Sequence, residues 1–294
     1  MQLRVLVIGA AGQLAGDLLP ALHAAGHDVT GVSRADCDIT HADTIAATLQ
    51  RARPQLVINT AAYHLVDRCE DEPEQAFAVN AIGVRSLALA AATADAALVH
   101  ISTDYVFNGR MPGPRRAYCE TDAPDPESVY ATSKLAGEQF VRHTSPRNCV
   151  VRTCGLFGAR GVGGRGDNFV ETMLRLARDG RALRVVNDQF VSPTATSDLA
   201  PALAQLVSVA DRPGICHLTS SGHCSWYEFA GAIFELAGIH DADLTPVSSA
   251  VYAAKARRPL WSVLGHDAAG AVGIPELPHW RDGLARYLAR PRPK

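Results

Sequence analysis

The chain begins with a short apolar run, Leu3–Gly9, that leads directly into a turn built from small residues. Gly9, Gly12 and Ala15 give the spacing G-x-x-G-x-x-A, and residues 13–25 have the apolar spacing of a helix that stops at Gly26. A strand, a turn of small residues and a helix in this order can hold a pyrophosphate against the N–H groups of the helix N-terminus. Small residues also suit a tight turn, but their position at the start of a strand–helix unit favours dinucleotide binding.

Apolar runs and alanine- and leucine-rich stretches then alternate through the first half of the chain. Runs that are apolar at nearly every position are typical of strands that helices cover on both faces. Right-handed crossovers arrange such units into an α/β fold of the Rossmann type, with a doubly wound parallel sheet. The expected strands are Leu3–Gly9, Asp28–Ser33, Leu56–Asn59, Ala97–Ser102 and Cys149–Thr153, with helices at about 13–25, 40–51 (capped by Thr40), 73–92 and 130–143.

After Thr153 the pattern is less regular, with a glycine- and arginine-rich loop at 155–167 that we expect to be mobile. An amphipathic helix at 168–178 follows, and Ser225 and Glu228 have the spacing of a capping box. The runs 183–186 and 215–218 are expected to be late strands of the same sheet. The predicted organisation is an NAD(P)-binding Rossmann domain at 1–155 plus about 183–222, with a smaller C-terminal substrate-binding unit at about 156–182 plus 223–294.

Charge and hydropathy exclude several classes of partner. The 294 residues include 28 Lys and Arg and 30 Asp and Glu, which gives a net charge of -2. A basic surface for nucleic acid is therefore not expected. No apolar run is long enough to cross a bilayer, so a membrane is not an expected partner. The 7 cysteines form no C-x-x-C pair, which predicts reduced thiols in a cytoplasmic protein and no zinc site, and the scattered histidines indicate no metal ligands.

The end of the second expected strand bears on the choice of cofactor. An NAD site usually places a carboxylate there, where it meets the ribose 2′-OH. Asp28 begins that strand, whereas Arg34 stands just beyond its end. A guanidinium suits a 2′-phosphate, so NADPH is the expected cofactor. Asp36 and Asp38 follow closely, so NADH is compatible with the sequence as well.

A tyrosine and a lysine four residues apart, Tyr130 and Lys134, share one face near the start of an expected helix. A free phenol has a pKa near ~10, and a nearby ammonium is expected to lower it toward the range of a usable proton donor. Ser102 and Thr103 end the fourth strand, at the edge where open parallel sheets bind their ligands. A hydroxyl at that edge can hydrogen-bond a carbonyl oxygen as charge develops on it, so these residues form one ordered set.

With this set the chain resembles the extended short-chain dehydrogenase/reductase family, and within it the reductases of a dTDP-linked 4-keto-6-deoxyhexose. The resemblance covers nearly the whole chain and no single motif carries it. It is carried by GAAGQLAG at 9–16, DIT at 38–40, NTAAYHLVD at 59–67, STDYVF at 102–107, YATSKLAGE at 130–138, NFVETMLRLAR at 168–178, VVNDQFVSPT at 185–194 and SWYEFA at 225–230.

The resemblance implies roles for the catalytic residues. Tyr130 is expected to donate a proton to the ketone oxygen while NAD(P)H delivers hydride to the ketone carbon. Lys134 is expected to hold the nicotinamide ribose and tune Tyr130, and Thr103 to hydrogen-bond the ketone oxygen. Asp104 is expected to meet the sugar, and Arg258, in the basic stretch 257–259, to contact the diphosphate, although a surface ion pair suits that arginine equally well.

The resemblance also implies the residues that line the cofactor and the sugar. The cofactor residues are Gly9, Gly12, Gln13, Leu14, Arg34, Asp38, Ile39, Ala61, Ala62, Tyr63, His64, Tyr130 and Lys134, and the substrate residues are Thr103, Asp104, Tyr130, Gly155 and Arg258. Some relatives are homodimers with Mg²⁺ at the contact, so a homodimer is a candidate assembly. Nothing in this sequence identifies ligands for such an ion.

The sequence departs from the family pattern at Gly155, where many relatives carry a tryptophan near the sugar. The loop at 158–166 is one candidate for replacing that surface, and Cys154 is the thiol nearest the expected pocket. A 4,6-dehydratase is disfavoured, because Tyr105 follows Thr103 and Asp104 where a dehydratase has glutamate. An epimerase that uses the same residues, and a non-catalytic regulatory subunit like that of methionine adenosyltransferase, remain alternatives.

Overall fold

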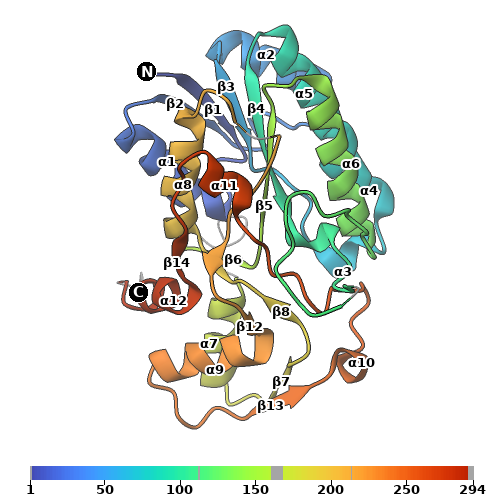
Figure 1. Cartoon of the computed structure of the whole chain (residues 1–294), viewed down its shortest axis with the longest axis vertical. Helices are drawn as coiled ribbons and strands as arrows, with labels where there is room; N and C mark the ends of the chain where they lie inside the picture. Colours follow the sequence, from blue (N-terminus) through green and yellow to red (C-terminus); the bar gives the residue numbers. More distant parts are fainter. Residues whose placement is uncertain (1, 112, 160–167, 213, 291–294) are drawn as a thin grey trace.

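The computed structural model describes residues 2–111, 113–159, 168–212 and 214–290. A parallel sheet with helices on both faces forms the upper part of the molecule in Figure 1, and short strands and helices lie below it. The predicted Rossmann-type fold with a smaller unit rich in C-terminal residues is therefore confirmed, while the exact division of the chain into two domains stays a prediction.

Six parallel strands form the large sheet in the order β10-β5-β4-β3-β1-β2. Their bounds are Arg4–Ile8 for β1, Asp28–Val32 for β2, Leu56–Asn59 for β3, Ala97–Thr103 for β4, Cys149–Thr153 for β5 and Ile215–His217 for β10. The chain runs outward from β1 to β2 and then returns to the other side of β1 to form β3. Sheets with such a reversal of strand order bind ligands beyond the carboxyl ends of the strands on either side of it, here β1 and β3, and this region is called the crevice below.

Helices cover both faces of the sheet and bury its apolar side chains. On one face lie α1 (Gln13–Ala24) and α8 (Thr196–Ser208), and on the other lie α2 (Ala42–Ala52), α5 (Val84–Thr93) and α6 (Val129–Thr144). Each face of the sheet has its own hydrophobic core, and alternate residues of one strand belong to different cores. Val7 packs in the core under α1, and Leu6 packs in the core under α2. The expected helix at 40–51 begins later, because the Thr40 hydroxyl binds the Asp38 carboxylate instead of capping the helix.

A continuous helix runs from 73 to 93 and consists of α4 (Pro73–Phe77), a π-helical turn (Ala78–Gly83) and α5. By length and hydropathy this helix passes the test for a membrane span, so the expectation that no such run exists is wrong. In the folded chain it packs beside α2 and α6 and buries Leu87 and Asn80, as a core helix does.

Four pairs of short strands lie outside the large sheet, and the strands labelled β7, β8, β12 and β13 are in the lower part of Figure 1, called the lower unit here. The four pairs are β6 (Leu156–Phe157) with β9 (Thr194–Ala195), β7 (Leu183–Val186) with β13 (Leu244–Val247), β8 (Phe190–Val191) with β12 (Cys224–Ser225), and β11 (Ser220–Ser221) with β14 (Leu277–His279). The helices of the second half, besides α8, are α7 (Phe169–Arg178), α9 (Trp226–Leu236), α10 (Ser249–Tyr252), α11 (Asp267–Ala271) and α12 (Trp280–Leu288). The capping box at Ser225 and Glu228 is confirmed at the start of α9.

The expectation that 183–186 joins the large sheet is wrong. This strand, β7, pairs in parallel with β13, whereas β10 takes the edge position beside β5. Both runs are short and apolar, and the identity of their partners depends on segments about sixty residues away. Most of the loop at 155–167, including the part considered as a replacement for tryptophan, lies outside the described residues.

Candidate active site

The turn between β1 and α1 brings backbone N–H groups to the crevice. Gly9 has a φ of +87°, and a Cβ built on it would stand 2.6 Å from Thr60 Oγ1 and 2.9 Å from Ala61 N. Only glycine fits this conformation without strain or displacement of the chain after β3. Gly12 caps α1 without a side-chain hydrogen bond, and the first turn of α1 contains no acidic residue. The positive end of the helix therefore faces the crevice without a competing carboxylate.

Gln13 and Leu14 follow at the start of α1, where Gln13 is partly exposed and its side chain makes two hydrogen bonds within the protein. The Gln13 amide donates to Leu156 O at 2.9 Å and accepts from Gly158 N at 3.2 Å. Leu14 is buried in the core against the sheet. Gln13 thus fastens the turn to the chain that enters the lower unit, and the expected cofactor contacts of Gln13 and Leu14 stay a prediction.

Arg34 stands just beyond the end of β2, with 76% of its side chain exposed. Its Nε donates to Asp38 Oδ2 at 3.1 Å, and Asp38 also accepts hydrogen bonds from Thr40. Burial raises the pKa of Asp38, but the hydrogen bonds from Thr40 and Arg34 outweigh it, so the net pKa is lowered. The carboxylate stays charged and holds the guanidinium at the mouth of the crevice. Ile39, beside it, is buried in the core.

The residues after β3, Ala61, Ala62, Tyr63 and His64, line the next part of the edge. Ala61 N donates to Asn59 Oδ1, and the Tyr63 backbone is held at both its N–H and its C=O by the side chain of Asn80. Asn80 is fully buried in the π-helical turn and also donates to Ser133 Oγ of α6 at 3.0 Å. One amide therefore fixes this loop against the helix that carries Tyr130 and Lys134.

Ser102 and Thr103, at the end of β4, point to different partners. Ser102 Oγ donates to Glu138 Oε1 at 2.5 Å inside the protein, where Arg152 pairs with the same carboxylate. Thr103 Oγ1 donates to Asp104 Oδ1 at 3.2 Å and accepts from Tyr105 N. Thr103 alone of the two hydroxyls stands at the crevice, because alternate residues of a strand face opposite sides.

Asp104 is a buried carboxyl with three side-chain hydrogen bonds. Its Oδ2 accepts from Ser262 Oγ at 2.5 Å and from Cys154 Sγ at 3.1 Å, and its Oδ1 accepts from Thr103. Burial raises the pKa of Asp104 to about 6, although the three hydrogen bonds work in the opposite direction. Burial and the Asp104 charge raise the pKa of the Cys154 thiol, so Cys154 remains a protonated donor.

Tyr130 lies in the first turn of α6, which Ser128 caps. Its ring meets the ring of Tyr105 edge-on, with centroids 6.0 Å apart. Burial raises the pKa of the Tyr130 phenol, while a hydrogen bond with Thr103 lowers it and the nearby Asp104 charge raises it. A neutral phenol in contact with the Thr103 hydroxyl is a proton donor placed beside a second polar group.

Lys134 is 2% exposed, and its amine points into the sheet. The Nζ atom donates to Ile101 O at 2.7 Å and lies 3.2 Å from His100 Nε2. Burial lowers the pKa of Lys134 to about 8, partly offset by Glu138. Burial raises the net pKa of Tyr130, and the expected lowering of that pKa by Lys134 stays a prediction.

Arg258 reaches the same crevice from the C-terminal part of the chain. Its NH2 atom pairs with Asp67 Oδ2 at 2.8 Å, and its guanidinium also meets the Tyr105 hydroxyl. Ala256 N donates to the same aspartate at 2.9 Å. The arginine is only 20% exposed, so this pair fastens the segment 256–258 onto α3 (Val66–Cys69) and is not a loose surface contact.

Gly155 and Thr153 lie where β5 leaves the sheet. Gly155 has a φ of +52°, and its Cβ would stand 3.2 Å from Pro193 Cα and 3.5 Å from Trp226 Cη2. A larger residue would be strained here, and the Trp226 indole occupies the adjacent space. Thr153 pairs in register with Thr103, and its buried hydroxyl has no hydrogen-bond partner in the described part of the chain.

Sequence reasoning missed four of these residues: Asn80, His100, Ser262 and Asp67. Ser262 and Asp67 touch partners 158 and 191 residues away, so no local pattern points to them. Asn80 lies in a helix that reads as uniformly apolar, where one buried amide is a detectable signal. His100 is a polar residue inside a buried strand, which is the same kind of signal.

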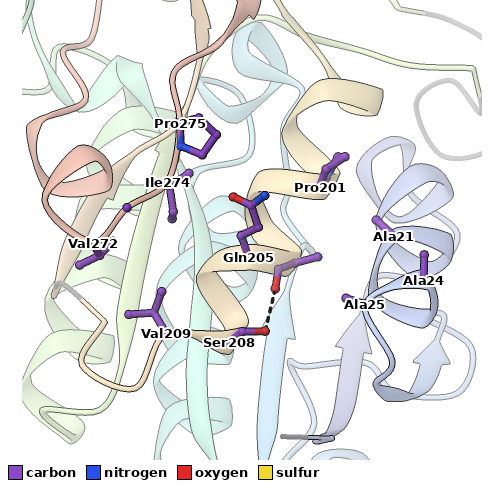
Figure 2. A pocket seen from close by; sticks show the side chains of 12 residues that line it. Ala21, Ala24, Ala25, Pro201, Gln205, Ser208, Val209, Val272, Ile274 and Pro275 are labelled. Carbon is purple, nitrogen blue, oxygen red and sulfur yellow. Dashed lines mark hydrogen bonds between the residues drawn. The ribbon is translucent and has the colours of Figure 1, made fainter.

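A groove of about 670 Å³ lies elsewhere on the molecule, between α1, α8 and the segment 272–275 (Figure 2). Its lining is mostly apolar and includes Ala25, Val209 and Ile274. Ala25 and Val209 follow the C-terminal ends of their helices, at the amino edge of the sheet. This edge is opposite to the one that carries Thr103 and Tyr130, so the groove is separate from the candidate active site.

Comparison with known proteins gives one consistent result. The family model described as RmlD substrate binding domain matches residues 3–292. The chain is 42% identical to the spore coat polysaccharide biosynthesis protein SpsK of Bacillus subtilis, over 97% of this chain and 96% of that protein. It is 40% identical to the dTDP-4-dehydrorhamnose reductase of Mycolicibacterium smegmatis, over 98% of this chain and 86% of that protein.

A solved structure agrees with these relatives. The crystal structure of dTDP-4-dehydrorhamnose reductase from Bacillus anthracis in complex with NADP superposes on this chain with a TM-score of 0.89 and 37% sequence identity. The alignment covers 98% of this chain and 99% of that one. Sequence and fold thus point to the same group of proteins across their whole length.

Proposed function

This chain belongs to the RmlD substrate-binding-domain family, and from that premise we propose that it is an NADPH-dependent reductase of a nucleotide sugar. It converts the C4 ketone of dTDP-4-dehydro-L-rhamnose into the alcohol of dTDP-L-rhamnose, as the names of its relatives imply. The single observation that carries this function is that Thr103 and Tyr130 meet at the carboxyl edge of a sheet whose first turn suits a dinucleotide.

The residues at the crevice fit NADPH. The uncapped N-terminus of α1 suits the pyrophosphate, and the exposed guanidinium of Arg34 suits a 2′-phosphate. Backbone groups of residues 61–64 are aligned beside this turn. The Thr153 hydroxyl, which has no hydrogen-bond partner among the described residues, provides a polar group farther along the same edge. When bound, NADPH supplies the hydride for the reduction.

Tyr130 and Thr103 act on the sugar ketone in this proposal. The Tyr130 phenol, whose raised pKa keeps it protonated, transfers its proton to the ketone oxygen as negative charge develops there. The Thr103 hydroxyl, which now donates to Asp104, turns to donate to the same oxygen. Asp104, Gly155 and Arg258 border the space for the sugar and the diphosphate.

An assay of NADPH oxidation tests the proposal directly. Purified protein is mixed with dTDP-4-dehydro-L-rhamnose and NADPH, and absorbance at about 340 nm is followed. We expect a decrease that depends on the sugar nucleotide. No decrease with either NADPH or NADH would refute the reductase, and product formation without net cofactor consumption would identify an epimerase instead.

The remaining expectations concern assembly and location. We infer a cytoplasmic protein from the 7 cysteines, all unpaired and six of them buried. A homodimer follows from the family resemblance alone, as does Mg²⁺ at its contact. Light scattering with and without Mg²⁺ tests both: a monomer in both conditions would contradict the dimer, and a dimer that survives chelation would contradict the role of the ion.

A further inference from the structure

The carboxyl of Asp104 takes part in no step of the proposed reaction, although three segments of the chain each direct a donor at it. Its Oδ1 accepts a hydrogen bond from Thr103 Oγ1 at 3.2 Å. Its Oδ2 accepts from Cys154 Sγ at 3.1 Å and from Ser262 Oγ at 2.5 Å. Asp104 and Cys154 are each 2% exposed and Ser262 is 0% exposed, so little water competes for these bonds.

The hydrogen bonds of Thr103 connect this carboxyl to the reaction. A hydroxyl has one proton to donate and two lone pairs that accept. Thr103 Oγ1 accepts from the backbone N–H of Tyr105 at 3.2 Å and gives its proton to Asp104. To donate to the ketone oxygen, as the proposed reaction requires, Thr103 must therefore withdraw its proton from Asp104 Oδ1.

A carboxylate inside the protein is destabilised when one of its donors leaves. The pKa of about 6 leaves Asp104 mostly ionised at neutral pH, so this cost applies to the proposed reaction. Three titratable groups that face the carboxylate carry no charge, because burial raises the pKa of Tyr105, Tyr130 and Cys154 and keeps them protonated. Arg258 reaches the Tyr105 hydroxyl, but its charge is paired with an aspartate of α3. The carboxylate therefore depends on the hydrogen-bond donors that remain.

Ser262 is the stronger of the two donors at Oδ2, because a hydroxyl donates more strongly than the thiol of Cys154. The backbone of Ser262 is held as well. Its N–H donates to Phe190 O at 3.0 Å, which fixes this segment beside β8. The Ser262 hydroxyl therefore stays in place when the Thr103 hydroxyl turns.

We propose that Ser262 is a positioning residue for the reduction, which holds the Asp104 carboxylate at Oδ2 while Thr103 turns from Oδ1 to the ketone oxygen. Cys154 supports the same oxygen with a weaker bond. The inference rests on the proposed function, because it explains how a hydroxyl of that same site becomes free to act. Ser262 follows Arg258 closely in the chain, so the C-terminal part contributes to the reacting group through a side chain that is itself fully buried.

Kinetic analysis of Ser262→Ala tests this role. We expect kcat to fall by about tenfold, because the Asp104 carboxylate keeps only the thiol donor when Thr103 turns, and KM for the sugar nucleotide to stay nearly unchanged. In a Thr103→Ala background, Ser262→Ala should cause little further loss, since no Thr103 hydroxyl remains to be released. A tenfold loss that persists in this background, or a change in KM alone, would overturn the proposal.

Ser220→Ala is the matched control. Ser220 is 1% exposed, and among the described residues its hydroxyl has no hydrogen-bond partner. Removal of this hydroxyl should therefore leave kcat and KM unchanged. An equal loss in Ser220→Ala would show that the fall in Ser262→Ala reflects the removal of any buried hydroxyl, which contradicts the proposal.

Carboxyl NMR of protein labelled with [¹³C]aspartate tests the same contact without any assay of activity, and Asp104→Asn assigns the signal. Ser262→Ala removes a donor to the charged form, so we expect the pKa of Asp104 to rise from about 6 by about one unit. Cys154→Ser places a stronger donor at the same oxygen, so the pKa of Asp104 should fall. An unchanged pKa in Ser262→Ala, or shifts in the same direction in both variants, would contradict the role of Ser262. The expected shifts in a protein that shows no turnover would contradict only the reductase.

Discussion

The two sides of the crevice are built in different ways. On the proposed cofactor side, Gly9, Gly12 and Arg34 lie within one strand–helix–strand segment, and the groups proposed to bind the cofactor are backbone N–H groups and one exposed side chain. On the substrate side, Asp104 meets Ser262 across 158 residues and Asp67 meets Arg258 across 191. The first side is local and open, whereas the second is assembled from distant segments and closed by buried polar contacts.

This difference has a physical consequence for each side. A site built from backbone N–H groups depends on the conformation of the turn, so its glycines can rarely be replaced. Such a site needs few side chains to hold it in place. A buried polar site is limited by desolvation, since each carboxyl or hydroxyl must keep its partners. Substitutions should therefore affect cofactor binding on one side, and pH-dependent stability or sugar turnover on the other.

Tyr130 stands where the two sides meet and gives the largest expected effect. Tyr130→Phe removes the acidic proton but keeps the ring, so kcat should fall by ~10³-fold while NADPH affinity stays nearly unchanged. Stopped-flow absorbance and fluorescence titration measure the two quantities. Tyr105→Phe is the control, as its ring lies 6.0 Å away and it should keep most of the activity. Equal losses in both variants would contradict the assignment of Tyr130 as the acid.

Asp104 tests the buried polar side through pH. Its pKa of about 6 in the folded protein lies above the usual 3.8, so the native state binds more protons between these values. The free energy of unfolding therefore decreases as pH rises through this window, by about 2–3 kcal/mol. Asp104→Asn should remove this decrease, which urea unfolding at several pH values measures.

The control for Asp104 is a surface carboxyl with the opposite shift. Hydrogen bonds from Arg116 hold the pKa of Asp122 below its usual value, so Asp122 stabilises the native state above its unfolded pKa. Asp122→Asn should therefore change the pH dependence in the opposite sense. A slope in Asp104→Asn that matches the unaltered protein would show that Asp104 is not the buried titrating group.

Gly9 tests the conformational limit of the cofactor side. Gly9→Ala places a Cβ within 2.6 Å of Thr60 Oγ1 at a φ of +87°, so we expect a loss of about 1–2 kcal/mol in stability and a weaker affinity for NADPH. Gly26→Ala is the matched control, because Gly26 has a φ of +83° with nothing within 4 Å of its Cβ. If both variants bind NADPH as before, the turn does not hold the pyrophosphate.

Arg34 gives the smallest effect. Arg34→Ala should raise the dissociation constant for NADPH by about tenfold, the value of one charge-assisted hydrogen bond, and leave that for NADH almost unchanged. Isothermal titration with both cofactors makes the comparison. Arg147→Ala, which removes a surface pair with Asp95, should change neither constant. Equal changes for the two cofactors in Arg34→Ala would remove the argument for the 2′-phosphate.

Much of the fold and part of the site were predictable from sequence, because their signals are local. The apolar strands, the glycine turn and the capping box at Ser225 depend on residues a few positions apart, and they lie where the sequence predicts. Tyr130 and Lys134 fall on one helix by spacing alone. The prediction that Thr40 caps a helix was wrong, because the Thr40 hydroxyl donates a hydrogen bond to the carboxylate of Asp38, two residues before it.

Only the tertiary structure decided which distant segments meet. β7 pairs with β13 and not with the large sheet, the Asp104 carboxyl accepts a hydrogen bond from Ser262, and the Lys134 amine lies beside His100 and the Ile101 carbonyl. The sequence determines what each segment prefers by itself, since backbone propensity and hydrophobic spacing act over a few residues. Pairing and side-chain direction depend on which buried groups must satisfy one another, and that is settled only when the whole chain packs.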